Sequence, residues 1–143
     1  MGESKISNDD IIRLSSFGVN AAKERFGVTL DFSKNSLQDL DNILEKAYLR
    51  FNDMALEGKL TDESIKRTSK IWGSYLGAVI QENNGGYWEE ENENLVLVVN
   101  SESFDPIGFV YSRITDKPHL RTVDYYEDCE SIILVSSLSE IGE

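Results

Sequence analysis

The side chains that could support catalysis in this 143-residue chain are few and widely spaced. There is one cysteine, Cys129, and one histidine, His119, ten residues before it. A cysteine nucleophile normally needs a neighbouring base that generates its thiolate. Because each residue is the only one of its type and the histidine falls in a predicted loop, chance explains the pair better than catalysis. We expect Cys129 to be a small packed residue, and we predict no catalytic residues.

The acids could instead gather a metal ion, and their densest run is Glu89, Glu90, Glu91, Asn92 and Glu93. Carboxylate oxygens suit Ca²⁺ or Mg²⁺. In a strand, however, neighbouring side chains point to opposite faces, so Glu90 would project away from Glu89 and Glu91. The run also lacks the ligand spacing and the glycine of a calcium loop, and no glycine-rich phosphate loop accompanies it. We therefore predict no metal site and no cofactor.

The acids are also unevenly distributed along the chain. Residues 84–143 hold 13 acids and 3 bases, which accounts for −10 of the formal net charge of −12, whereas residues 1–83 are nearly balanced. Localised charge of one sign steers encounters with partners of the opposite sign. Nucleic acid is disfavoured as a direct ligand, because its phosphates would be repelled. A basic protein is the partner class that this pattern favours.

The size and composition are typical of one cytoplasmic globular domain. Hydrophobic residues make up 40% of the chain and charged residues 28%, as in ordinary soluble proteins. The longest apolar runs, residues 95–99 and 132–135, are far shorter than the roughly 18 residues of a membrane span, so we expect no membrane association. A single cysteine permits no intrachain disulfide, and the first residues lack the apolar core of a signal peptide.

Capping residues and apolar periodicity predict three helices in the first 84 residues. Ser7 caps the first helix and Gly27 ends it, Ser33 caps the second, and Thr61 opens the third. Apolar residues recur at helical spacing in all three. In the first helix they are Ile11, Leu14, Phe17, Ala21, Ala22 and Phe26. In the third, Gly73 and Gly77 lie one turn apart and predict the close approach of another element.

The rest of the chain predicts a hairpin followed by helices. Residues 86–90 and 95–99 form two strands around a polar turn, and residues 100–103 form a second turn. Asp105 and Pro106 then begin a helix. Residues 122–139 favour a helix, with a strand over 132–135 as the alternative. The expected fold is one α+β domain over residues 1–143, in which N-terminal helices pack on a small antiparallel sheet and C-terminal helices follow.

Two groups of acids flanking aromatic residues are the candidate partner-binding site. Tyr87 and Trp88 are adjacent in a strand, so we expect one to be buried and the other exposed beside the glutamates. An exposed aromatic ring among acids suits the anchoring of a basic partner, and either Trp88 or Tyr125 could serve. The predicted partner-binding residues are Tyr87, Trp88, Glu89, Glu90, Glu91, Glu93, Asp124, Tyr125, Glu127 and Asp128.

Four segments resemble a family of small, uncharacterised bacterial cytoplasmic proteins. Their pattern reads D-[FY]-S-x-x-S-L-x-x-L-D at residues 31–41, W-G-x-Y-L-G-x-V-I at 72–80, G-G-x-W at 85–88 and P-[FI]-G-x-V-Y-x-R at 106–113. Small acidic proteins of this kind resemble the immunity proteins of bacterial toxin systems. The resemblance implies a protein that binds and blocks one cognate toxin, and it brings no catalytic residues.

These observations lead to one principal hypothesis and two alternatives. The principal one is an immunity protein whose acidic surface occludes the active site or substrate groove of a basic toxin, with a nuclease as one candidate. The first alternative is a non-enzymatic adaptor or regulator, and the second is a hydrolase or ligand-binding enzyme that uses acidic residues, with or without a metal. The sequence leaves monomer and dimer equally open.

Overall fold

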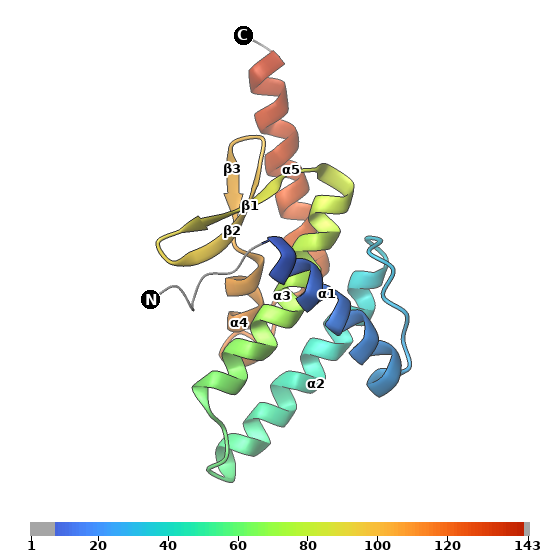
Figure 1. Cartoon of the computed structure of the whole chain (residues 1–143), viewed down its shortest axis with the longest axis vertical. Helices are drawn as coiled ribbons and strands as arrows, with labels where there is room; N and C mark the ends of the chain where they lie inside the picture. Colours follow the sequence, from blue (N-terminus) through green and yellow to red (C-terminus); the bar gives the residue numbers. More distant parts are fainter. Residues whose placement is uncertain (1–7, 142–143) are drawn as a thin grey trace.

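The computed structural model describes residues 8–141, with side chains up to Leu138. Within these residues, five α-helices, a π-helical turn and a three-stranded antiparallel sheet follow one another, and the α+β class is confirmed. The helices come first, then the sheet, then two further helices (Figure 1). The elements are α1 (Asn8–Ala21), η1 (Ala22–Phe26), α2 (Ser36–Leu56), α3 (Asp62–Asn84), β1 (Tyr87–Glu91), β2 (Asn94–Val99), β3 (Glu102–Phe104), α4 (Pro106–Thr115) and α5 (Thr122–Ile141).

Local hydrogen bonds explain most of the helix ends. Thr61 Oγ1 accepts from the backbone N–H of Ser64 at 3.1 Å and begins α3. An Asp105 carboxylate oxygen accepts from the N–H of Gly108 at 2.9 Å, and Pro106 takes the first position of α4. Both caps confirm the prediction. The expected cap at Ser33 is only partly right, since α2 begins at Ser36. The expected cap at Ser7 lies outside the described residues.

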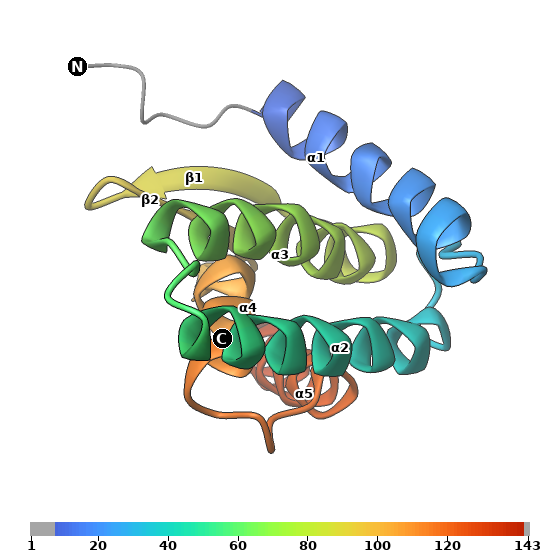
Figure 2. The same ribbon diagram turned by 90° about the horizontal axis from the view of Figure 1, so that it is seen from below.

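Helix α3 is the centre of the molecule, and its two glycines bring other elements close to it. It lies between α1 on one side and α2 and α4 on the other (Figure 2). A Cβ atom at Gly73 would come within 2.5 Å of Ile107 Cα, so α4 passes directly over that position. Gly77 faces the indole ring of Trp88. The close approach predicted from the glycine spacing is therefore confirmed at both positions.

The first helix departs from its predicted apolar face. Phe17 was expected in the core, yet its side chain is exposed. Gly18 faces the core instead of Phe17. It packs so closely on Trp72 that an added Cβ atom would lie only 3.1 Å from the ring. The close packing of Gly18 on α3 rotates α1 so that Ile11 and Ser15 face inward. A single helix cannot reveal this rotation, since the preference for Gly18 comes from the neighbouring tryptophan.

The sheet has the strand order β1-β2-β3, and β2 is central. Both turns use residues with positive φ, Asn92 and Glu93 in the first and Asn100 and Ser101 in the second. Such residues are typical of two-residue hairpin turns. The sequence prediction missed β3, because it assigned residues 100–103 to a turn. The prediction that both faces of residues 95–99 are covered is confirmed, since all five side chains are buried.

Helix α5 resolves the ambiguity over the last segment in favour of a helix. The backbone N–H of Thr122 donates to Asp41 Oδ1 at 2.6 Å, so a carboxylate from α2 satisfies the first turn of α5. The Thr122 hydroxyl also donates to the Leu37 carbonyl at 3.2 Å. A carboxylate at a helix N-terminus also complements the helix dipole. Among the described residues, no helix combines the length and the apolar character that a bilayer crossing requires.

Candidate partner-binding surface

The β1–β2 hairpin separates the predicted binding residues onto two faces. Trp88 is paired with Leu97 and is only 7% exposed. Its ring lies against Gly77, and its Nε1–H donates to Gln81 Oε1 at 3.2 Å. Trp88 is therefore a core residue, and the expectation that it could anchor a partner is wrong. The alternation that sends one aromatic inward leaves Tyr87 exposed on the outer face.

The acids of the hairpin are all exposed. Glu89 and Glu91 share the outer face of β1 with Tyr87, whereas Glu90 is on the other face. Glu93 lies in the turn between the strands, at a φ of 70°. This hairpin surface therefore combines one aromatic ring with several carboxylates. It has no cluster of exposed apolar side chains.

The second predicted group lies on α5. Asp124, Glu127 and Asp128 are exposed, and Glu127 forms an ion pair with Lys34 at 3.1 Å. Tyr125 differs from the expectation, because its ring packs on Phe109 with centroids 4.3 Å apart. Its hydroxyl accepts from the Asp105 backbone N–H at 3.1 Å, and burial raises its pKa. Tyr125 joins α4 to α5, and it is not available as an anchor.

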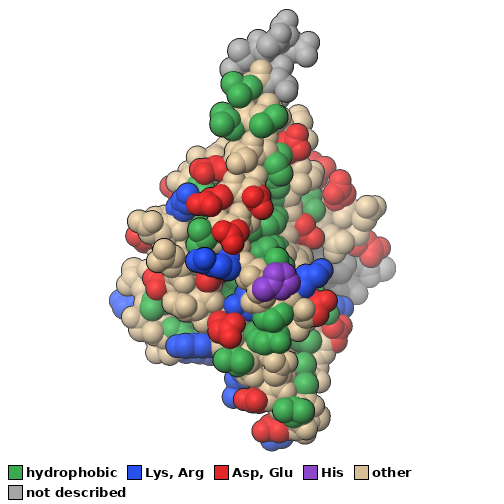
Figure 3. All heavy atoms as spheres, turned by 180° about the vertical axis from the view of Figure 1, so that it is seen from behind, with side chains coloured by type: hydrophobic (Ala, Val, Ile, Leu, Met, Phe, Trp, Pro, Cys, Tyr) green, Lys and Arg blue, Asp and Glu red, His purple; other side chains and the backbone are tan. Residues whose placement is uncertain are grey.

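Beyond these acids, the same outward face of α5 becomes apolar. Residues three and four apart share a face of a helix, so the face continues from Asp124 and Asp128 through Ser131 to residues 134, 135 and 138. The exposed apolar residues are Ile132 at 44%, Leu134 at 60%, Val135 at 62% and Leu138 at 58%. Residues 131–139 carry no charge. We call this continuous surface, from Asp124 to Leu138, the α5 ridge (Figure 3).

The sequence prediction did not include this apolar half of the α5 ridge. Four consecutive apolar residues occupy positions 132–135. Successive helical residues are turned by about 100°, so four in a row cannot all face one core. Ile133 is buried, and its neighbours on both sides are exposed. Once the segment is known to be a helix, this run by itself indicates an exposed apolar surface.

The structure does not bring the two predicted groups together. The tip of the β1–β2 hairpin projects away from α5 (Figure 1), and α5 contacts the sheet through its C-terminal half, where Ser136 and Ser137 hydrogen-bond to Asn100. The expected single acidic surface is therefore two separate surfaces. Of these two surfaces, the α5 ridge is the one in which acids adjoin several exposed apolar side chains. That combination of an apolar centre and a polar rim is characteristic of protein interfaces.

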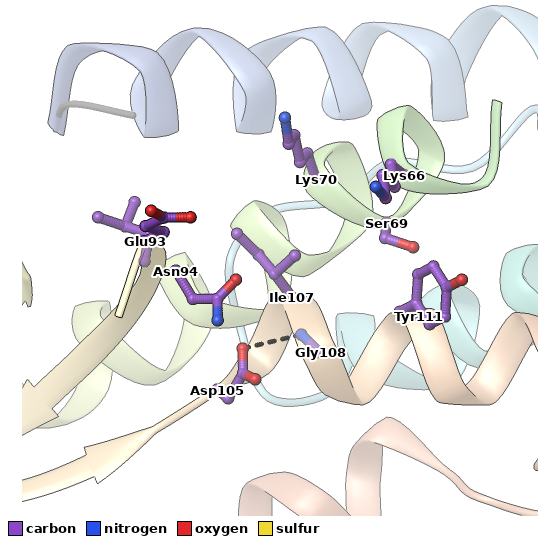
Figure 4. A pocket seen from close by; sticks show the side chains of 10 residues that line it. Lys66, Ser69, Lys70, Glu93, Asn94, Asp105, Ile107, Gly108 and Tyr111 are labelled. Carbon is purple, nitrogen blue, oxygen red and sulfur yellow. Dashed lines mark hydrogen bonds between the residues drawn. The ribbon is translucent and has the colours of Figure 1, made fainter. Parts of the chain in front are cut away.

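A pocket of about 340 Å³ lies between α3, α4 and the first hairpin turn (Figure 4). Much of its polar lining already has partners. Asp105 caps α4, the Ser69 hydroxyl donates to the Ile65 carbonyl at 2.8 Å, and Lys66 pairs with Asp62 at 3.1 Å. These groups stabilise helix ends and surfaces, and they do not form a nucleophile and base pair.

The remaining candidates for chemistry are also engaged in packing or exposed singly. Cys129 is 2% exposed, and burial raises its pKa to about 12, so it is a thiol at neutral pH. A thiolate is the reactive form of cysteine. His119 lies exposed in the loop before α5. Among the side chains that the structure describes, no three from histidine, cysteine or acidic residues converge as a metal site.

No protein-family model, curated protein or solved structure matches the chain.

Proposed function

We propose that this chain is a cytoplasmic protein-binding domain of the immunity type, which blocks a basic cognate toxin through its α5 ridge. The observation that carries the proposal is the change along one face of α5 from exposed acids to exposed apolar side chains. Leu134, Val135 and Leu138 supply the apolar centre of an interface, and Asp124 and Asp128 supply its acidic rim. The resemblance to small acidic bacterial proteins supports the same class.

The two halves of the α5 ridge have different roles in binding. Exposed acids accelerate encounter with a basic partner and make the association rate dependent on salt. Apolar side chains at the centre of a contact contribute most of the binding energy when water leaves them. The acids at the start of α5 would therefore guide the toxin, and the apolar end would hold it. Occlusion of the toxin's active site or substrate groove needs no chemistry from this chain.

Affinity capture with matched variants tests the proposal. Tagged wild-type protein is incubated with a lysate of the source organism, the bound proteins are identified by mass spectrometry, and the partner is purified. Two double variants alter the α5 ridge. One combines Leu134→Ser with Val135→Ser, and the other combines Asp124→Lys with Asp128→Lys. Glu89→Lys with Glu91→Lys is the control, because it changes the charge equally on the hairpin. Circular dichroism confirms that each variant is folded.

We expect both α5 variants to weaken binding by about tenfold or more, and the hairpin control to change it by less than about twofold. Charge reversal on α5 should mainly slow association and reduce its salt dependence. The purified partner should be basic, and its toxic activity should be lost when wild-type protein is added. Binding that depends on the hairpin and not on α5 would refute the surface assignment.

The alternative is an adaptor without enzymatic activity, and one observation favours it. The tip of the β1–β2 hairpin, which includes Glu91 and Glu93, projects away from α5 (Figure 1), so two partners could be held at once. The same capture experiment separates the two functions. Two partners recovered together, one lost with the α5 variants and the other with the hairpin variant, and neither toxic, would identify an adaptor.

A further inference from the structure

A groove of about 810 Å³ runs between α1 and α3. Two large apolar side chains lining it are exposed, Ile12 at 62% and Phe17 at 52%. The rotation of α1 that packs Gly18 against Trp72 is what leaves them outside the core. Large exposed apolar side chains gathered in one groove mark an interaction site more often than an ordinary surface.

The groove is basic, although the chain as a whole is acidic. Arg13, Arg67 and Lys70 line it together with a single acid, Asp10. Arg13 pairs with Asp10, whereas Arg67 and Lys70 have no ion-pair partner among the described residues. Lys70 points from α3 toward α1 (Figure 4). The groove lining therefore has an excess of two basic side chains over acidic ones, in a protein of net charge −12, and the acids Asp62 and Glu63 lie next to Arg67 and Lys70 in the neighbouring pocket.

We propose that this groove binds an acidic amphipathic helix of a partner protein. Apolar side chains of that helix, spaced three and four residues apart, would cover Ile12 and Phe17, as in other helix-in-groove complexes. Its carboxylates would pair with Arg67 and Lys70, and paired charges set the orientation of such a helix. Nucleic acid is a poorer occupant, because its phosphates would pair with the basic side chains but would leave Ile12 and Phe17 unmatched.

This site is distinct from the proposed toxin-binding surface. The groove lies between α1 and α3, and Figure 2 shows α1 and α5 on opposite sides of α2 and α3. The two sites also favour partners of opposite charge. The inference therefore does not rest on the proposed function, and the groove can be occupied whether or not α5 binds a toxin.

Two designed helical peptides serve as probes in the experiment. Both carry the same leucine and phenylalanine face, and the opposite face is glutamate in one and lysine in the other. Chemical shifts of the backbone amides of the full chain are followed during titration with each peptide. The variants are Phe17→Ser and Arg67→Glu with Lys70→Glu. The control is Arg50→Glu with Lys59→Glu, an equal charge change at exposed positions outside the groove.

We expect the acidic peptide to shift amides of residues 12–20 and 66–71 and to bind at least about tenfold more tightly than the basic one. Each groove variant should weaken that binding about tenfold, and the control variant should not. The proposal is overturned if the acidic peptide does not bind, if both peptides bind equally, or if the shifts fall on α5. A wild-type dimer, detected by sedimentation, that Phe17→Ser dissociates would also overturn it, because the occupant would then be a second copy.

Discussion

Replacing Gly77 by alanine tests whether the missing side chain at this position of α3 is what allows Trp88 of β1 to pack against the helix. In an exposed helix interior, glycine to alanine stabilises by about 1 kcal/mol, since alanine has the higher helix propensity. At this position an added Cβ would lie within 3.0 Å of two carbons of the Trp88 ring, closer than real Cβ atoms approach. The ring cannot easily retreat, because Trp88 is paired with Leu97 and its indole N–H donates to Gln81.

The magnitude follows from these opposing effects. Overpacking costs about 1–3 kcal/mol, and complete loss of the buried indole would cost about 3–5 kcal/mol. The gain in helix propensity, about 1 kcal/mol, reduces the first cost to about 0–2 kcal/mol and the second to about 2–4 kcal/mol. We therefore expect Gly77→Ala to lower the free energy of unfolding by about 2 kcal/mol, the value at which the two ranges meet. Urea unfolding followed by circular dichroism measures this change. Glu82→Ala, at an exposed position of the same helix, should change it by less than about 0.5 kcal/mol.

Making the same substitution in a protein that lacks the Trp88 ring tests whether that ring causes the loss of stability. In a Trp88→Leu protein the shorter side chain leaves room for the added methyl group, so Gly77→Ala should now stabilise by about 0.5–1 kcal/mol. The sign of the effect should therefore reverse between the two backgrounds. An equal cost in both backgrounds, or stabilisation in the native one, would refute the packing argument.

Two further predictions concern buried polar groups. Arg113 is buried and donates to Glu45 at 3.0 Å, but its Nε and Nη1 have no partner among the described residues. Arg113→Met should therefore change the free energy of urea unfolding by less than about 1 kcal/mol or increase it, whereas Glu45→Ala should lower it by about 1–2 kcal/mol by leaving a buried charge unpaired. Equal losses in both variants would contradict this reasoning. Burial raises the pKa of Tyr126 and of Cys129 to about 12 in the folded protein. The unfolded chain therefore loses these two protons at a lower pH than the folded chain does, and the free energy of unfolding should fall as the pH rises from about 9 to about 12. Urea unfolding across that range should show a shallower decline for Cys129→Ala than for the native chain, and a flat native profile would exclude the linkage.

Much of the order of helices and strands follows from local residue patterns. Thr61, Asp105 with Pro106, and Gly27 act on the backbone within a few residues of themselves, so their effects can be read without a fold. The apolar spacing of α2 and α3 is equally local, and it predicts their buried faces well. The adjacent Tyr87 and Trp88 also predicted one inward and one outward ring, because side chains alternate in any strand.

Other features depend on residues far apart in the chain. Phe17 is exposed because Gly18 packs on Trp72, and α5 begins where Asp41 accepts the N–H of Thr122. The identity of the buried ring in the hairpin depends on Gly77, which makes room for Trp88. These contacts depend on shape and distance between separate elements, which periodicity along one element does not encode. The α5 ridge and the basic groove both arise in this way, as the helix faces that packing leaves uncovered.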